Sequence, residues 1–133
     1  MQTETLMDNL LLLSAGDGDE RTYYTKPTNA AQNAKVCVLF LDILELVTGE
    51  KVRITVMPQH SADAKAWRDL SQSALIDTNN PPSTDDAKEG LYSGATSDDF
   101  GAWMRFAVKV VENQTPTGQV QATVNLKAVW KPF

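Results

Sequence analysis

The feature that most constrains the fold is the alternation of apolar and polar residues near the C-terminal end of the sequence. From residue 120 to residue 130, apolar residues occupy every second position, mostly separated by Gln, Thr, Asn or Lys. Residues 104–110 repeat the pattern. A period of two is typical of a strand that is buried on one face. Because the turn-rich residues 112–118 join the two stretches, the pattern predicts a long antiparallel hairpin.

The alternation also assigns side chains to the two faces of this hairpin. We expect the bulky apolar members to form a core face. The other members form a mixed outer face of low charge, which suits docking against another subunit. The predicted core side chains are Met104, Phe106, Val108, Val120, Val124, Leu126 and Trp130, and the predicted outer ones are Trp103, Arg105, Gln121, Thr123 and Asn125.

Residues 36–47 form a nearly continuous apolar run with two acidic interruptions. Such a run predicts a central strand covered on both faces, or a strand with a bulge that switches its inward set. A helix is the alternative, because Leu, Glu and Asp tolerate one. With a bulge, the inward set would change from Val38 and Phe40 to Ile43 or Leu44.

After a short turn at residues 48–51, strict alternation resumes, with Val52, Ile54 and Val56 on one face. We expect Pro58 to end this strand, since proline cannot donate to the ladder. Residues 36–57 would then form a second hairpin.

Shorter strands are expected in residues 1–15, 21–25 and 73–77, and at Leu91 and Tyr92. Residues 1–20 could serve as an N-terminal arm, and residues 78–101 are rich in turn formers and read as a long loop. Several short alternating strands favour one all-β domain over residues 1–133: an antiparallel two-sheet sandwich of jelly-roll type.

Composition narrows the function. The 133-residue chain has a formal net charge of −5, so it lacks the basic stripe that nucleic-acid binding requires. With one cysteine and one histidine, it can form neither an internal disulfide nor a Cys/His metal cluster. Cys37 is interpreted as a small buried apolar residue, and no cofactor is expected.

No apolar run approaches the ~20 residues of a membrane span, and Glu4 and Asp8 argue against a signal peptide.

The candidate catalytic residues have simpler readings. His60, Ser61 and Asp63 include the residue types of a hydrolytic triad, but adjacent positions rarely point at one centre, and no Gly-x-Ser-x-Gly elbow accompanies them. A solvated turn is the better interpretation. Asn113-Gln-Thr115 has the form of a glycosylation acceptor, and turn chemistry explains it equally well.

Acidic residues gather in two loops. Asp17, Asp19 and Glu20 resemble the start of a calcium loop whose later ligands are missing. Asp98 and Asp99 could pair with Glu89 or Asp86 as a glycosidase acid and base, a chemistry that needs two carboxylates about 5 to 9.5 Å apart. Hydrated turns are the preferred reading of both groups.

The three tryptophans, Trp67, Trp103 and Trp130, could stack on a sugar. Trp130 lies on the apolar phase and is expected in the core, whereas Trp103 is expected to face outward, towards a ligand or a subunit interface.

The middle of the chain resembles a known group of proteins. A Val-Arg-Ile-Thr-Val strand at residues 52–56 is followed by Ser61-x-Asp63-x-x-x-Trp67-x-x-Leu70, a Gly-containing loop, and the final alternating strands. This arrangement, over residues 52–126, is similar to the small β-sandwich proteins of tailed-bacteriophage structural modules. The resemblance implies a structural role, as capsid decoration or another virion component present in many copies, and brings no catalytic residues with it.

The sequence therefore predicts a non-enzymatic virion protein, made in the host cytoplasm, that cements or decorates a capsid. Its expected partners are a major capsid protein or other virion protein and its own copies, with no nucleic acid and no membrane. A carbohydrate-binding module is the alternative, and a hydrolase comes third. The expected interface side chains are Leu10, Leu11, Leu12, Leu13, Tyr23, Tyr24, Leu91, Tyr92 and Trp103.

Overall fold

The computed structural model describes residues 2–14, 20–29, 34–47, 52–79, 87–96, 100–112 and 121–132. The secondary structure of these ranges consists of strands, and none of them holds a helix long and apolar enough to cross a membrane. The strands are β1 (Gln2–Leu13), β2 (Arg21–Tyr24), β3 (Val36–Val47), β4 (Val52–Ser61), β5 (Arg68–Asp69), β6 (Ile76–Asp77), β7 (Gly90–Ala95), β8 (Trp103–Glu112) and β9 (Gln121–Lys131).

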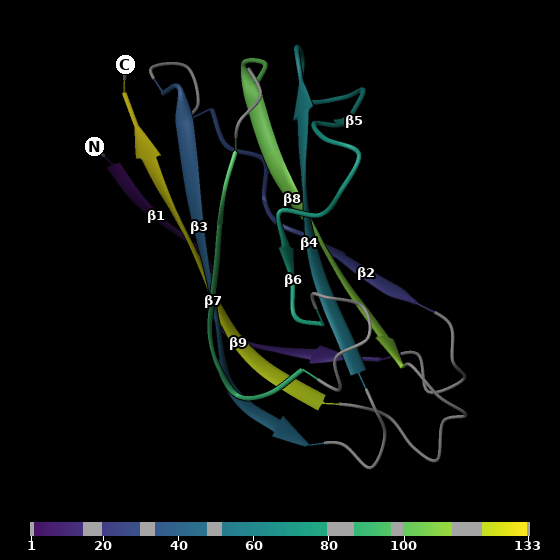
Figure 1. Cartoon of the computed structure of the whole chain (residues 1–133). Helices are drawn as coiled ribbons and strands as arrows, with labels where there is room; N and C mark the ends of the chain where they lie inside the picture. The colour runs from purple at the N-terminus through teal and green to yellow at the C-terminus, as the bar shows by residue number, and fades with distance from the viewer. Residues whose placement is uncertain are drawn as a thin grey trace.

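The strands form two antiparallel sheets that pack face to face (Figure 1). The first sheet has the order β1-β9-β3-β7, and the second has the order β2-β8-β4-β5, with β6 also pairing with β4. Along the chain, the strands alternate between the sheets, apart from β4, β5 and β6, which stay together. Two sheets connected in this way form a jelly-roll sandwich. The predicted all-β fold class is confirmed.

The predicted hairpins are wrong. β8 pairs with β2 and β4, whereas β9 pairs with β1 and β3, so the two strands lie in opposite sheets. β3 and β4 are separated in the same way. Alternation requires only that one side of a strand meets an apolar surface. In a sandwich the opposite sheet supplies that surface, so alternation does not identify the hydrogen-bonded neighbour.

The core between the sheets contains the predicted apolar side chains of both long strands. Phe106 and Trp130 are its largest members, with ring centroids 6.3 Å apart, although they come from opposite sheets. Met104, Val108, Val124 and Leu126 are also fully buried, and Val120 lies outside the described residues. The core assignment is therefore confirmed for every described member, while the predicted common outer face is split: Trp103 and Arg105 lie on the second sheet, and Gln121, Thr123 and Asn125 lie on the first.

β3 is a central strand, as predicted, and it carries a bulge between Ile43 and Glu45. Its inward set differs from the prediction. Val38 and Phe40 are half-buried, and the fully buried positions belong to the other phase. Leu44, at the bulge, keeps the outward phase of Val38 and Phe40 and is 42% exposed. The buried members are Cys37, Leu39, Leu41 and Ile43.

β4 continues through Pro58 to Ser61, so the expected end of this strand is wrong. The Pro58 carbonyl accepts a hydrogen bond from the Leu70 amide. In an antiparallel ladder, the nitrogen and carbonyl of one residue point to the same side. The proline nitrogen therefore faces the interval between β5 and β6, where no ladder partner is needed.

The N-terminal segment is an integral edge strand, because β1 pairs with β9 from Gln2 to Leu13. An arm is therefore excluded for these residues. In the predicted long loop, β7 contains Leu91 and Tyr92, as expected, and pairs with β3. A side chain at Gly94 would lie 2.2 Å from the Leu75 carbonyl oxygen, so glycine permits β7 to approach the segment before β6.

Candidate functional site

The triad-like residues build a turn. The Ser61 hydroxyl donates to the Asp63 carboxylate at 3.0 Å and accepts from the Ala64 amide. The Asp63 carboxylate also accepts from the Lys65 and Ala66 amides, and these bonds, with the one from Ser61, lower the pKa of Asp63. Ala64 adopts a positive φ of 63° inside this turn.

His60 takes no part in that turn, because its Nδ1 accepts a hydrogen bond from the Gly101 amide at 3.1 Å. The serine and the histidine therefore have separate structural partners. This arrangement supports the turn interpretation over a hydrolytic triad, although Ser61 is buried rather than solvated.

The turn carries Trp67 onto the outer side of the second sheet. There, the Arg105 guanidinium carbon lies 4.5 Å from the centroid of the Trp67 ring and 4.2 Å from that of the Tyr24 ring. Arg105 Nε donates to Gln59 Oε1 at 2.7 Å, and Gln59 Nε2 donates to Asp69 at 2.9 Å. We call these five side chains the Arg105 platform: Tyr24, Gln59, Trp67, Asp69 and Arg105.

The platform combines four separate pieces of the second sheet. Tyr24 comes from β2, Arg105 from β8, Gln59 from β4 and Asp69 from β5. Tyr24 and Arg105 share the outer face because Tyr24 pairs with Ala107, two residues along β8 from Arg105. Tyr24 remains 54% exposed. The platform is thus an accessible surface of aromatic rings and planar polar groups.

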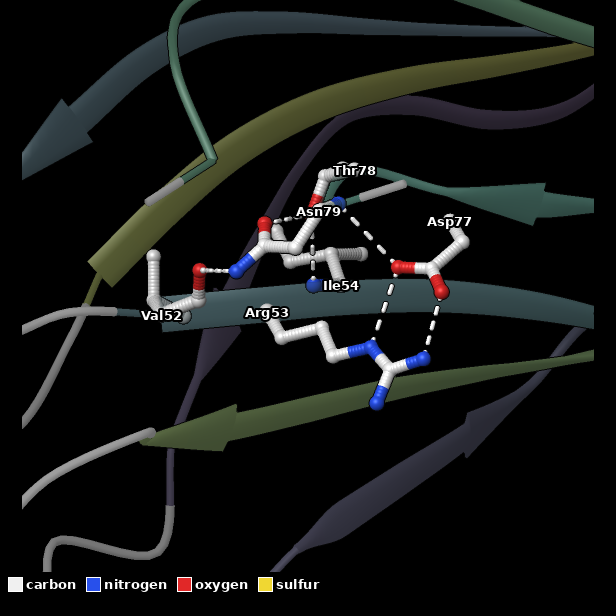
Figure 2. A network of polar contacts seen from close by, with 6 residues as sticks. All are labelled: Val52, Arg53, Ile54, Asp77, Thr78 and Asn79. Atoms are coloured by element: carbon white, nitrogen blue, oxygen red, sulfur yellow. Dashed lines mark hydrogen bonds and ion pairs between the residues drawn. The ribbon is translucent and has the colours of Figure 1, made fainter. Parts of the chain in front are cut away.

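A different polar network orders the other end of β4 (Figure 2). Arg53 forms a two-bonded ion pair with Asp77 of β6, and the Asp77 carboxylate also accepts from the Asn79 amide. These bonds lower the pKa of Asp77, with the Arg53 hydrogen bond as the largest cause. The buried Asn79 side chain donates to the Val52 carbonyl, and the Thr78 hydroxyl accepts from the Ile54 amide. The network ties β6 and the residues after it to β4.

The nine predicted interface residues do not share one surface. Leu10 and Leu11 on β1 are 41% and 49% exposed, and Leu91 on the opposite edge strand is 65% exposed. Trp103 is half-buried on the outer side of the second sheet, in the same phase as Arg105. Tyr24 belongs to the Arg105 platform.

The other four residues have roles inside the fold. Leu12 is fully buried, so it is not an interface residue. The Tyr23 hydroxyl accepts from the Leu13 amide and donates to the Leu13 carbonyl, which links the edges of the two sheets. The Tyr92 hydroxyl makes the same pair of bonds with the backbone of Lys88. Both tyrosine hydroxyls are therefore used within the fold.

Two exposed apolar residues were missed at the sequence level. Leu44 and Val47 on β3 are 42% and 53% exposed, at the end of the first sheet that also carries Leu10 and Leu11. Gln121 of β9 pairs with Val47, and the neighbouring Thr123 pairs with Leu11. We call Leu10, Leu11, Leu44 and Val47 the apolar end of the first sheet. The predicted bulge in residues 36–47 was the available indication, because a bulge changes which side chains face outward.

The proposed metal and acid-base positions find no support in the described residues. Within them, no group of three His, Cys, Asp or Glu residues could hold a metal ion. Glu89 accepts from the Leu46 amide, and Glu20 lies 3.9 Å from the Lys109 amine. The remaining acidic residues of both loops lie outside the described ranges, as does the glycosylation-like site: Asp17, Asp19, Asp86, Asp98, Asp99 and residues 113–115.

Cys37 and the cavity offer no reactive group either. Burial raises the pKa of the Cys37 thiol to about 12, so it stays protonated near neutral pH. A cavity of about 260 Å³ lies between Pro58, residues 70–75, which follow β5, and the end of β7 at Thr96. The Thr96 hydroxyl accepts from the Cys37 amide, and the Ser71 hydroxyl donates to the Ser73 carbonyl. These hydroxyls of the cavity lining thus already have partners within the chain.

No protein-family model and no curated protein matches the chain. Among solved structures, it is similar to that of infectious bursal disease virus Gx strain, with 12% identity, a TM-score of 0.55, and coverage of 96% of this chain and 30% of that chain. The Gt strain of the same virus gives 10% identity, a TM-score of 0.51, and coverage of 96% and 30%. The chain thus spans less than a third of the viral chains it matches.

A weaker similarity is to the CBM36-1 domain of a multidomain xylanase from the hindgut metagenome of Trinervitermes trinervoides. It has 9% identity, a TM-score of 0.45, and covers 91% of this chain and 78% of that one. That similarity is too low to bear on function. The viral structures establish a β-sandwich of a kind that occurs in viral proteins, which is coarser than the tailed-phage group expected from the sequence.

Proposed function

We propose that the chain is a non-enzymatic structural component of a virion, held in place by contacts with its own copies and with a shell protein. The observation that carries the proposal is the apolar end of the first sheet. Four large apolar side chains there remain between 41% and 53% exposed in the isolated chain. Exposed apolar groups gathered in one area are typical of protein contact sites. The jelly-roll topology, which is common in capsid proteins, supports the same function.

The geometry of this area suits a contact. Leu11 and Val47 flank β9 on its two sides, at Thr123 and Gln121, which places their strands about 10 Å apart. β1 has a hydrogen-bonded neighbour on one side only within the described sheet. Leu10 and Leu11 lie on opposite faces of β1, because Leu10 pairs with the core residue Val124 and Leu11 pairs with the outward Thr123. A partner that covers both must therefore wrap around the strand edge. Fully burying one leucine contributes about 1.5–3 kcal/mol.

Sedimentation tests the proposal. We expect the wild-type chain to self-associate as its concentration rises, or to co-sediment with capsid shells, because either contact covers the apolar end. The double variant Leu11→Lys with Val47→Lys should lose both behaviours while keeping its circular dichroism spectrum. Leu91→Lys is the matched control, since Leu91 is exposed at the opposite edge of the sheet. A chain that stays monomeric and never co-sediments with shells contradicts the proposal.

The finer assignment within this function is capsid decoration or cementing. It is supported by the presence of contact groups on the first sheet together with a different, polar-aromatic outer side on the second. A cementing protein needs a surface for the shell and another that faces away from it. The second candidate function, carbohydrate binding, is supported by the Arg105 platform.

A further inference from the structure

Two arginines of the second sheet, Arg53 on β4 and Arg105 on β8, point to its outer side and have different partners. Arg53 is neutralised by Asp77. The Arg105 Nε donates a hydrogen bond to Gln59. Within the described part of the chain, its two terminal NH₂ groups donate no hydrogen bond and form no ion pair with a carboxylate. A guanidinium has five donors in a fixed plane, so four of them remain for a ligand.

Arg105 is also held in place before any ligand arrives. Its guanidinium lies against the rings of Tyr24 and Trp67, at 4.2 and 4.5 Å from their centroids. Trp67 is in turn positioned by the Ser61 and Asp63 turn. Binding groups whose conformation is already fixed lose less conformational entropy on binding. The platform therefore has the order expected of a binding site.

The groups beside Arg105 define what could bind. Gln59 and Asp69 are planar and hydrogen-bonded to one another, and they add amide and carboxylate acceptors to the guanidinium donors. The carbon-bound hydrogens of a sugar ring pack on aromatic faces, while its adjacent hydroxyls both donate and accept. Because the guanidinium covers one face of each ring, the aromatic surface left for a sugar is the exposed part of Tyr24 and of the half-buried Trp67. Arg105, Gln59 and Asp69 supply the donors and acceptors beside it.

We infer that the Arg105 platform binds a neutral carbohydrate. The Asp69 carboxylate, which is hydrogen-bonded to Gln59, and the net charge of −5 disfavour an acidic ligand. A neutral sugar satisfies the donors and the acceptors together. This inference deepens the second candidate function by assigning it to five residues. It is compatible with a virion role, because the platform and the apolar end of the first sheet lie on different sheets.

Affinity electrophoresis in gels that contain soluble galactan, xylan or glucan, followed by an array of neutral and acidic oligosaccharides, tests the inference. We expect retardation by a neutral glycan, and at least a tenfold weaker affinity in Trp67→Ala and in Arg105→Lys. The lysine variant keeps the charge and loses the planar fork. Lys127→Ala, on the outer side of the first sheet, is the matched control and should bind as the wild type does.

Several outcomes would overturn the inference. The first is that the chain binds no neutral glycan. The second is that binding persists in both platform variants, and the third is that binding is restricted to acidic glycans or to protein ligands. Circular dichroism of each variant verifies that it is folded. Because the platform variants leave Leu11 and Val47 intact, sedimentation reports on the virion function independently of the outcome with glycans.

Discussion

The two sheets present similar inner faces and very different outer ones. Inside, both sheets contribute fully buried apolar side chains, such as Leu126 from β9 and Val108 from β8. Outside, the first sheet ends in four exposed apolar side chains, whereas two arginines of the second sheet, Arg53 and Arg105, are each held by specific partners. Burial determines the inner pattern, and the outer groups determine what each sheet can contact.

The outer face of the second sheet is itself divided. Arg53 and Arg105 lie near opposite ends of the paired strands β4 and β8, since Arg53 pairs with Val111 and Arg105 pairs with Gln59. Gln59 lies six positions along β4 from Arg53, which corresponds to about 20 Å. One arginine stabilises the fold by an ion pair, and the other is ordered by rings and keeps donors available. The comparison predicts that changes at the two ends will have different effects.

Among changes on the outer faces of the sheets, the largest effect on stability is expected at the Arg53 end. Asp77→Ala removes the partner of Arg53 and an acceptor of the Asn79 amide, so we expect the free energy of unfolding to fall by about 1–2 kcal/mol in urea titrations. This loss of stability is at the low end of the range for hydrogen bonds between charged groups, because the Arg53 side chain is 41% exposed and partly screened by solvent. Asp69→Ala, which removes an exposed carboxylate, should change stability by less than about 0.5 kcal/mol. Equal losses in the two variants would contradict the comparison.

The second effect concerns pH. The pKa of Asp77 is lowered from its ordinary value of 3.8, mainly by the hydrogen bond from Arg53. A carboxylate of this kind stabilises the fold above its ordinary pKa, and the contribution is lost as pH falls through the lower pKa of the folded state. We expect the free energy of unfolding to decrease below about pH 4. Asp77→Asn should show a shallower decrease, and an unchanged slope would disprove the assignment.

A smaller effect is expected at the platform. Trp67→Ala removes a ring beside Arg105, and an exposed cation–π contact contributes about 0.5–1 kcal/mol. We therefore expect a loss of stability below that of Asp77→Ala, measured by the same titration. Loss of more than about 3 kcal/mol would assign Trp67 to the core rather than to a surface platform.

The smallest effect on stability is expected at the apolar end of the first sheet. Leu11→Lys exchanges a side chain that is 49% exposed, so the free energy of unfolding should change by less than about 0.5 kcal/mol. The matched core change, Leu12→Ala, should cost about 2–5 kcal/mol, because Leu12 is fully buried. Similar losses at the two neighbouring positions would contradict the described orientation of β1.

Sequence patterns predicted the fold class and most of the core, because apolar alternation responds directly to burial. They could not assign partners to strands, since β8 and β9 show the same alternation in opposite sheets. The phase of β3 was wrong because both of its faces carry apolar residues, which leaves Cys37 and Val38 equally suited to the core. The platform was missed because Tyr24, Trp67 and Arg105 meet only through strand pairing and a turn, although Trp67 and Trp103 were singled out as possible sugar-stacking residues.

Hydrogen exchange at low and high protein concentration tests the central claim most directly: the first sheet mediates assembly, and the second keeps its platform accessible. We predict that increasing concentration slows amide exchange in residues 10–13 and 44–47 and leaves residues 62–69 unchanged. The claim would be contradicted by protection that rises with concentration in residues 62–69 alone, or by no added protection anywhere in the first sheet either at high concentration or with capsid shells present.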